Sequence, residues 1–218
     1  MKAEKTKYRS ALVAVPTARR RESGVGLIEV LIAVLILAVG ILGLAQMQLS
    51  AKRASFEATQ RSIATSLARD ILERIRSNPG EAATYAVATP ANGIVLDAAY
   101  TFPAVTDCTT NSCTAAQLAA YDMRDWTEMV RGDRIMVDVG GTDIPAGGLL
   151  NPVVCMFENA GVITVVIAWQ GINEIDQTLL NDPIDLGGNS LGECGDGLFG
   201  TDDKLRRQLA MSTFVAEI

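Results

Sequence analysis

"SGVGLIEVLIAVLILAVGILGL", residues 23–44, sets the architecture of the chain, because it is a long apolar run with a single carboxylate, Glu29, near its start. From Val30 to Ala51 there is no Lys, Arg, Asp or Glu, and these 22 residues make enough helix to cross a bilayer about 30 Å thick. A charge at membrane depth costs roughly 3 kcal/mol or more. Glu29 therefore needs a cationic partner, a route to the lipid headgroups, or a function.

The apolar run continues without proline into residues 51–80, where the pattern becomes amphipathic and ends at the stop signal "SNPG", residues 77–80. We predict one helix from Val25 to Ser77, about 80 Å long at 1.5 Å per residue. Its second half is expected to pack on a globular domain. The apolar stripe of that half contains Phe56, Ile63, Leu67, Ile71 and Ile75. Its expected ion pairs are Glu57–Arg61, Arg69–Glu73 and Asp70–Arg74.

After Pro79 the chain shows short apolar segments between Gly, Pro, Asn and Asp, a pattern typical of strands. The predicted strands are residues 93–97, 134–140, 153–158, 162–169 and 209–215. Residues 157–164 predict a hairpin turn, and residues 114–130 predict a second helix with Thr114 as its N-cap. The fold class is therefore α+β, with a small antiparallel sheet packed on the second half of the long N-terminal helix.

Charge divides the chain into two parts. Residues 1–24 contain seven Lys or Arg and two Glu, whereas the remainder has 12 basic and 23 acidic residues, a net charge of −11. The positive-inside rule then places the N-terminus in the cytoplasm and the globular domain outside. The acidic balance argues against nucleic acid as a partner, although "KLRR", residues 204–207, is a candidate local basic patch.

All four cysteines, Cys108, Cys113, Cys155 and Cys194, fall in the part expected to be exported. An even number in an oxidising compartment indicates two disulfides, and three pairings are possible. Loop closure favours Cys108–Cys113 as a local clip, with Cys155–Cys194 joining the C-terminal third. A structural clip is favoured over redox chemistry at Cys108 and Cys113.

The chain contains no histidine, which removes Ser/His and Cys/His catalysis and His-ligated zinc. We expect no catalytic residues, no metal and no cofactor. The acidic loop at residues 192–204 contains Glu193, Asp196, Asp202 and Asp203, but its spacing is not that of an EF-hand, and a solvated loop is favoured over a calcium site. Trp126 and Trp169 are expected to lie in the core.

The segment from Gly24 to Val30, between a basic leader and an apolar helix, resembles the processing site of type IV prepilins. The resemblance implies that a prepilin peptidase cuts after Gly24 and methylates the new amine of Val25. Residues 1–24 would then be the leader, residues 25–51 the transmembrane and assembly half of the helix, and residues 52–218 the exported domain. The family usually has Phe at the position of Val25 and Thr at that of Gly26.

The same resemblance implies an assembly role for Glu29. The α-amino group of Val25 on a neighbouring subunit would be the cation that pairs with this carboxylate inside an apolar helix bundle and helps to fix the register. The competing interpretation is a Glu that reaches the lipid headgroups and has no assembly role.

Residues 27–48, 64–79, 108–130 and 162–171 look like successive blocks of the PilV-type minor pilins, the type IV pilus modification proteins. This resemblance implies a non-catalytic subunit of the pilus or of its tip or priming complex, supporting pilus assembly, adhesion and twitching motility. Its expected partners are other minor and major pilins, the prepilin peptidase and the inner-membrane assembly machinery. The expected location is the inner membrane, as a single-pass protein, and then the pilus at the cell surface.

Three alternatives stay open at this stage. A minor pseudopilin of a type II secretion system shares the leader and differs in its partners. A membrane-anchored exported enzyme or redox protein would keep an unprocessed anchor and would need convergent catalytic side chains. A DNA-binding competence pilin is disfavoured by the acidic exported part.

Overall fold

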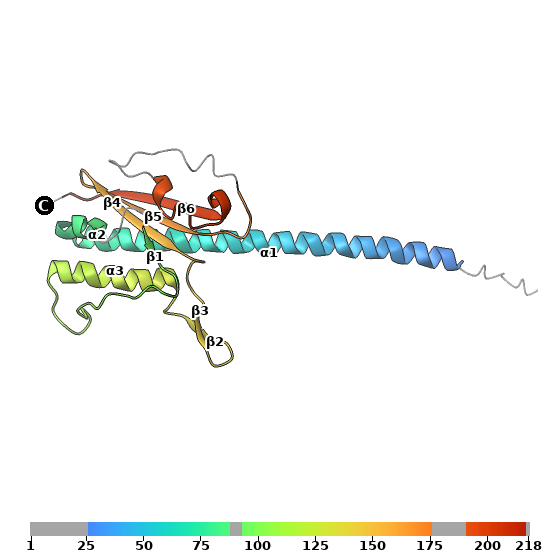
Figure 1. The fold of residues 1–218 in the computed structure, drawn as a ribbon, viewed down its shortest axis with the longest axis horizontal. Coiled ribbons are helices and arrows are strands. Elements are labelled where there is room, and N and C mark those ends of the chain that lie inside the picture. Colours follow the sequence, from blue (N-terminus) through green and yellow to red (C-terminus); the bar gives the residue numbers. More distant parts are fainter. Residues whose placement is uncertain (1–25, 88–92, 176–190, 217–218) are drawn as a thin grey trace, which may run out of the picture. The chain divides into compact units, whose positions relative to one another are not determined.

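The computed structural model describes residues 26–87, 93–175 and 191–216. The chain divides into two units, of which the first ends at Gln48 and the second begins at Leu49. The helices are α1 (Leu27–Ser77), α2 (Ala82–Val87) and α3 (Ala115–Arg131), with short 3-10 turns at Pro79–Glu81, Leu191–Glu193 and Thr201–Asp203. The strands are β1 (Ile94–Val95), β2 (Met136–Asp138), β3 (Asp143–Pro145), β4 (Val153–Asn159), β5 (Val162–Gln170) and β6 (Arg206–Phe214) (Figure 1).

Helix α1 ends at Ser77, where the sequence predicted its end. The next residue, Asn78, leaves the helical conformation with φ −131° and ψ 58°, and Pro79 follows it. The Asn78 side chain donates from Nδ2 to the carbonyl oxygen of Ala115 at 2.9 Å. The end of α1 is thereby attached to the start of α3.

Four strands form one antiparallel sheet in the order β1-β4-β5-β6. The predicted hairpin is β4–β5, in which Asn159 pairs with Val162 across the turn. The fold class predicted from the sequence is confirmed: a small antiparallel sheet lies on the second half of α1.

The predicted strand at residues 134–140 does not join this sheet. Its central residues form β2, which pairs with β3 in a separate two-stranded ribbon. Gly140 and Gly141, both with positive φ, turn the chain back directly after β2, so the nearest available partner is the following segment. The sequence prediction missed β3 because its three residues, Asp143–Pro145, include two poor strand formers.

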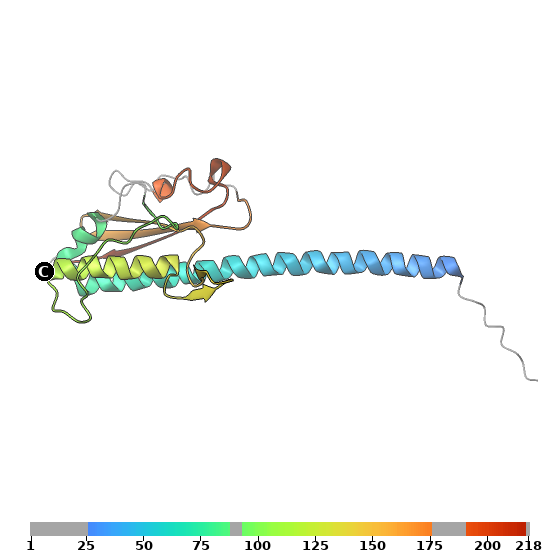
Figure 2. The same ribbon diagram turned by 60° about the horizontal axis from the view of Figure 1, so that its bottom comes forward.

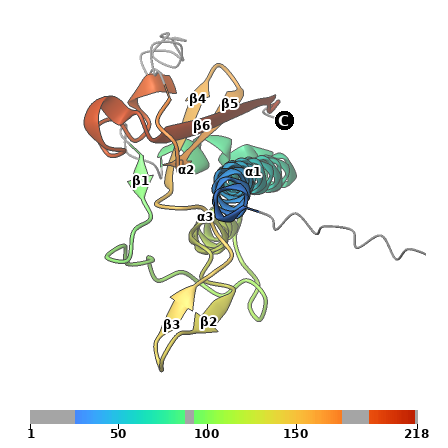
Figure 3. The same cartoon turned by 90° about the vertical axis from the view of Figure 1, so that its right-hand side faces the viewer.

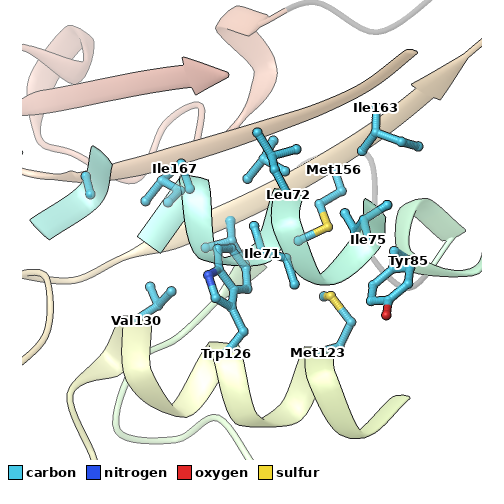
Figure 4. Packing of buried hydrophobic residues seen from close by; sticks show 14 of the residues in the cluster. Ile71, Leu72, Ile75, Tyr85, Met123, Trp126, Val130, Met156, Ile163 and Ile167 are labelled. Carbon is cyan, nitrogen blue, oxygen red and sulfur yellow. The ribbon is translucent and has the colours of Figure 1, made fainter. Parts of the chain in front are cut away.

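The core of the second unit lies between the sheet, the second half of α1, and α3. Seen along the axis of α1, the sheet lies on one side of this helix and α3 on the other (Figure 3). Ile71, Leu72 and Ile75 of α1 meet Met156, Ile163 and Ile167 of the sheet (Figure 4). From the other side α3 contributes Met123, Trp126 and Val130 (Figure 4).

The predicted apolar stripe on α1 is correct near the end of the helix and rotated at its beginning. Ile71 and Ile75 are fully buried, whereas Phe56 is exposed, and the buried residues before Ile71 are Gln60, Ala64 and Ala68. Alanine lets another element come close to the helix backbone, and the Trp126 indole nitrogen does so, donating to the Leu67 carbonyl at 2.8 Å. The contact between α1 and α3 is therefore marked by small side chains, which a search for large apolar residues at helical spacing does not find.

Most of β4 and β5 is buried on both faces of the sheet, which explains why these two strands are continuous apolar runs in the sequence. Val154 and Met156 belong to the main core, whereas Val153, Cys155 and Phe157 belong to a second cluster with Cys194 and Phe199. Successive side chains of a strand point to opposite faces, so each of these strands contributes side chains to both clusters. The segment at residues 191–205 contributes to the second cluster and thus covers the face of the sheet that is turned away from α1.

Helix α3 has the N-cap that its sequence predicted, Thr114, and a glycine C-cap that the sequence analysis did not consider. Thr114 and Gln117 form a reciprocal capping box at the start, and Gly132, with φ 91°, closes the last turn. A Cβ atom on Gly132 would lie 2.2 Å from the amide nitrogen of Gly148. The chain entering the β2–β3 ribbon therefore crosses the chain leaving it at a point where only glycines fit. The ribbon, drawn in yellow, lies near the end of α3 (Figure 2).

Candidate assembly surface on α1

The first part of α1 presents a long, mostly apolar surface. Every described side chain from Leu27 to Leu49 is exposed, Leu27 to 83% and Ile28 to 71%. The helix is long and apolar enough to cross a membrane. Soluble monomers rarely expose contiguous apolar area on this scale, so lipid or other apolar helices must cover it.

Glu29 lies in the first turn of α1. The amide groups of Glu29 and Val30 both donate to the Gly26 carbonyl, at 2.8 and 3.4 Å. A negative charge at this end is favoured by the helix dipole. Within the described residues the Glu29 carboxylate has no ion pair, and the nearest Lys or Arg that follows it in the chain is Lys52, more than six helical turns away. A cation for Glu29 therefore has to come from the chain before Gly26 or from another molecule.

The helix face that carries Glu29 also carries small residues. At 3.6 residues per turn, Ala33, Gly40 and Gly43 fall within about 40° of Glu29 around the axis. A Cβ atom added to either glycine would meet nothing within 4 Å. Glu29, Ala33 and Leu37 border a shallow depression on this side. Small side chains let a second apolar helix come close to the backbone, so this face can bring a partner helix next to the carboxylate.

Gly24 and Val25, the predicted cleavage and methylation positions, lie outside the described residues, so both assignments stay predictions. The structure contains two disulfides, Cys108–Cys113 and Cys155–Cys194. This is the pairing that loop closure favoured. The first closes a polar loop directly before α3, and the second is buried and joins β4 to the segment at residues 191–205.

The acidic loop at residues 192–204 uses Asp203 to hold its own backbone. This carboxylate accepts hydrogen bonds from the amides of Gly197 (2.9 Å) and Phe199 (3.0 Å) and lies 3.6 Å from Arg206. Burial raises the pKa of Asp203, but these backbone bonds and the Arg206 charge outweigh it, so the pKa lies below its ordinary value. Asp196 and Asp202 point into solvent. Among the residues that the structure describes, no three potential ligands gather for a metal ion.

The stretch at residues 204–207 does not form the basic surface patch considered in the sequence analysis. Arg206 is buried and donates to the carbonyl of Gly192 at 2.7 Å. Arg207 pairs with Glu57 of α1. Lys204 is exposed and lies 3.8 Å from an oxygen of Asp202. Two of the three cations therefore hold the fold together and are not available to phosphate groups.

Sequence reasoning missed a polar network that joins three helices. Arg74 of α1 donates to Asp70 (2.9 Å) and to two carboxylates of α3, Asp122 (3.1 Å) and Asp125 (2.8 Å). Tyr85 of α2 donates to the other oxygen of Asp122 at 2.8 Å. Burial, followed by this contact with Asp122, raises the pKa of Tyr85 above its ordinary value. The sequence feature that could have indicated this network is the pair of acidic residues at positions 122 and 125, on the same face of the helix as Trp126.

Two family models match consecutive parts of the chain. The prokaryotic N-terminal methylation motif matches residues 19–45, and the model described as type IV pilin Tt1218 matches residues 46–132. Neither the curated proteins nor the solved structures gave a match. The first region contains Glu29 and most of the apolar surface of α1, and the second contains the half of α1 that packs in the core together with α3.

Type IV pilins are structural proteins, and a pilin with the methylation motif is processed by prepilin peptidase and assembles with other pilins. The chain is therefore similar to type IV pilins over the two matched regions, and its long apolar N-terminal helix and small antiparallel sheet are consistent with the pilin fold.

Proposed function

We propose that this chain is a type IV pilin and, within that family, a minor pilin of the PilV type. It is made as a prepilin with the leader in the cytoplasm, held in the inner membrane by α1, cut after Gly24 and methylated at Val25. It then enters the pilus or its tip or priming complex and supports assembly, adhesion and twitching motility. The observation that carries the proposal is Glu29, a lone carboxylate in the first turn of an exposed, otherwise uncharged apolar helix.

The mechanism follows from the cost of leaving Glu29 unpaired. Once the helix leaves the headgroup region for an apolar bundle, the carboxylate needs a cation, and processing after Gly24 creates one at Val25 of each subunit. Pairing between subunits is little screened in such a bundle. It stabilises one axial register over others, because sliding a helix by one turn, about 5.4 Å, separates the two charges.

The first test measures the intact mass and the N-terminal sequence of the protein from cells with and without prepilin peptidase. The expected product begins at Val25, carries one added methyl group, and appears only when the peptidase is present. A chain that keeps residues 1–24 in both strains would be an unprocessed single-pass membrane protein, and this result would contradict the proposal. Replacing Gly24 with a bulky residue is expected to give that uncut chain.

The second test separates processing from assembly. Glu29→Gln is expected to be cut and methylated at the normal level but to be depleted from sheared pili at least tenfold, because the amide leaves the Val25 ammonium unpaired. Glu29→Asp keeps the charge and serves as the matched control, with an intermediate effect. Normal incorporation of Glu29→Gln would show that the carboxylate only reaches the headgroups.

The minor role is tested by stoichiometry. Quantitative mass spectrometry of sheared pili is expected to find this chain at a small fraction of the main fibre subunit, and deletion of its gene is expected to reduce the number of fibres. A chain found as the main subunit would be a major pilin. If deletion leaves the pili intact and blocks protein secretion, the chain is a pseudopilin of a type II secretion system.

A further inference from the structure

Two turns of α1, directly before its first contact with the globular domain, carry a pair of exposed cations. We call this segment, residues 49–56, the neck. Every described residue up to Phe56 is exposed, and Glu57 is the first residue of α1 that is partly covered. Lys52 and Arg53 lie in the middle of the neck, and among the described residues neither forms a salt bridge.

The neck contains no acid that could neutralise these cations. Glu57 lies one helical turn after Arg53 and would be its partner on the helix surface. Both oxygens of Glu57 are instead bonded to Arg207 of β6, at 2.8 and 3.0 Å. The neck is therefore purely positive, whereas the chain after Gly24 has 12 basic and 23 acidic residues, a net charge of −11. An anionic partner is attracted to the neck and repelled by most of the domain.

The length of the preceding helix gives the depth of the neck in a membrane. The 22 uncharged residues from Val30 to Ala51 span about 33 Å, close to the hydrocarbon thickness of a bilayer, about 30 Å. The helix is long and apolar enough to cross a membrane. With these residues in hydrocarbon, Lys52 and Arg53 lie at the level of the lipid phosphates. Lipid is therefore the anionic partner that reaches the neck first.

The side chains of the neck suit a helix that leaves the hydrocarbon. Leu49, Lys52, Arg53 and Phe56 fall within about 100° around the helix axis. Leu49 and Phe56 are 47% and 38% exposed, so apolar groups flank the cations on this side. Lys and Arg lay their stems along apolar surface while their charged ends reach the interface. A guanidinium can hold a phosphate through two hydrogen bonds, and an ammonium holds it as a point charge.

We propose that Lys52 and Arg53 bind the phosphate groups of anionic lipids where α1 leaves the membrane. The inference rests on the proposed function, because that function places the neck at the outer surface of the inner membrane. Two cations here do not oppose this orientation, since seven precede Gly24. The contact sets the height of the domain above the membrane, and the subunit has to give it up when it leaves the lipid for the pilus.

The test places a photoreactive amino acid at Leu49 in the full-length chain. The chain is reconstituted in vesicles with equal amounts of phosphatidylglycerol, which is anionic, and phosphatidylcholine, which is zwitterionic. Irradiation is expected to give adducts whose masses show phosphatidylglycerol in at least threefold excess. Leu49 lies one turn before the cations and on their side of the helix, so it samples the lipids that they hold. The cations of residues 1–24 lie beyond the other end of the apolar run and are screened from this position.

Charge variants show whether the two cations cause the excess. Lys52→Gln with Arg53→Gln is expected to bring the two lipids to equal yields. Lys52→Arg with Arg53→Lys keeps both charges and should keep the excess. Arg61→Gln with Arg69→Gln is the matched control, because it removes two exposed cations from the same helix. Arg61 is about 12 Å beyond Arg53, more than the Debye length of about 8 Å in physiological salt, so this control should not change the lipid ratio.

Equal yields of the two lipids with the parent chain overturn the inference, and so does an excess that survives Lys52→Gln with Arg53→Gln. The other possible partner is a carboxylate of another pilin. In cells that lack the pilus assembly machinery, an adduct that joins Leu49 to a pilin peptide in place of lipid would identify that partner and overturn the lipid contact.

The outcomes also separate this inference from the proposed function, because processing at Val25 and presence in sheared pili are measured for the same variants. A chain that is processed and incorporated, but shows no phosphatidylglycerol excess, overturns the lipid contact alone. A chain that shows the excess, but is neither processed nor incorporated, supports the lipid contact and overturns the proposed function.

Discussion

Arg207 on β6 and Glu57 on α1 form a two-bond ion pair, with Nε 2.8 Å from Oε2 and Nη2 3.0 Å from Oε1. The same carboxylate accepts from the Ile172 and Asn173 amides at 3.0 and 3.3 Å, and Arg207 donates to the Asn173 carbonyl at 2.7 Å. One carboxylate thus joins a helix, a strand and the loop after β5. Both side chains are mostly buried, so breaking the pair leaves an uncompensated charge.

Removing the Arg207 side of this pair is expected to destabilise the second unit. Arg207→Met should lower the free energy of unfolding by about 1–3 kcal/mol, because Glu57 loses its cation in a partly buried site. Arg124→Met is the matched control, since Arg124 bonds Glu128 one turn away in a more exposed position, and a change under about 0.5 kcal/mol is expected. Urea unfolding of the full chain in detergent, followed by the fluorescence of the two tryptophans, both buried in this unit, measures the difference. Equal effects of the two substitutions would contradict the prediction.

The same pair makes stability depend on pH. Burial raises the pKa of Glu57, but the bond to Arg207 and the Asn173 and Ile172 amides outweigh it, so the pKa in the folded chain lies below the ordinary 4.5. A lowered carboxyl pKa contributes stability that is present above pH 4.5 and is lost as the pH falls through the folded-state pKa. Glu57→Gln is expected to be less stable at pH 7 and to lose less stability on acidification than the parent. Parallel curves of unfolding free energy against pH for the two proteins would refute this.

The two disulfides are expected to contribute unequally. Cys155 and Cys194 are 39 residues apart and buried, whereas Cys108 and Cys113 are 5 apart at the surface. Loop-closure entropy alone gives about 4 kcal/mol for the long loop and about 2 kcal/mol for the short one. Replacing each pair with alanine and comparing urea midpoints under oxidising conditions tests the order. A larger loss from the Cys108 and Cys113 replacement would mean that loop closure does not govern these bridges.

The crossing of two backbones at Gly132 and Gly148 predicts an intolerance to even one added carbon. A Cβ on Gly148 would lie 2.3 Å from the carbonyl carbon of Arg131, so Gly148→Ala has to push apart the end of α3 and the base of the ribbon. We expect a loss of about 2–4 kcal/mol. Gly80→Ala is the control, because a Cβ there meets nothing within 4 Å, and it should stay within about 0.5 kcal/mol of the parent. Thermal unfolding of the two variants side by side measures the contrast.

Local signals predicted the elements well, because the cause of each lies within a few residues. The end of α1 before "SNPG", the Thr114 cap of α3 and the β4–β5 hairpin are all present. Trp126 and Trp169 are buried as expected. The exposed Glu29 at the start of an apolar helix was evident for the same reason, since charge and periodicity are read directly from the chain.

Partners distant in sequence were not predictable in the same way. Of the three expected helix ion pairs, only Asp70–Arg74 is present. Glu57 bonds Arg207 in place of Arg61, and Glu73 bonds Arg76 in place of Arg69. An exposed pair one turn apart contributes only a few tenths of a kcal/mol, so a two-bond contact in a partly buried site outcompetes it. Which strand supplies that contact depends on the sheet register, which no local pattern encodes.

The placement of residues 60–75 of α1 between the sheet and α3 has a mechanical consequence. Gln60 bonds the backbone of Gly148 and Leu150, and beyond the other end Asn78 bonds Ala115 at the start of α3, so the segment is attached to other parts of the fold near both of its ends. Sliding the helix along its axis would break both attachments and shear the packed side chains between them at the same time. Tension applied along this segment in a fibre is therefore shared by all of these contacts at once. The core resists extraction of the helix better in this arrangement than if its contacts could break one after another.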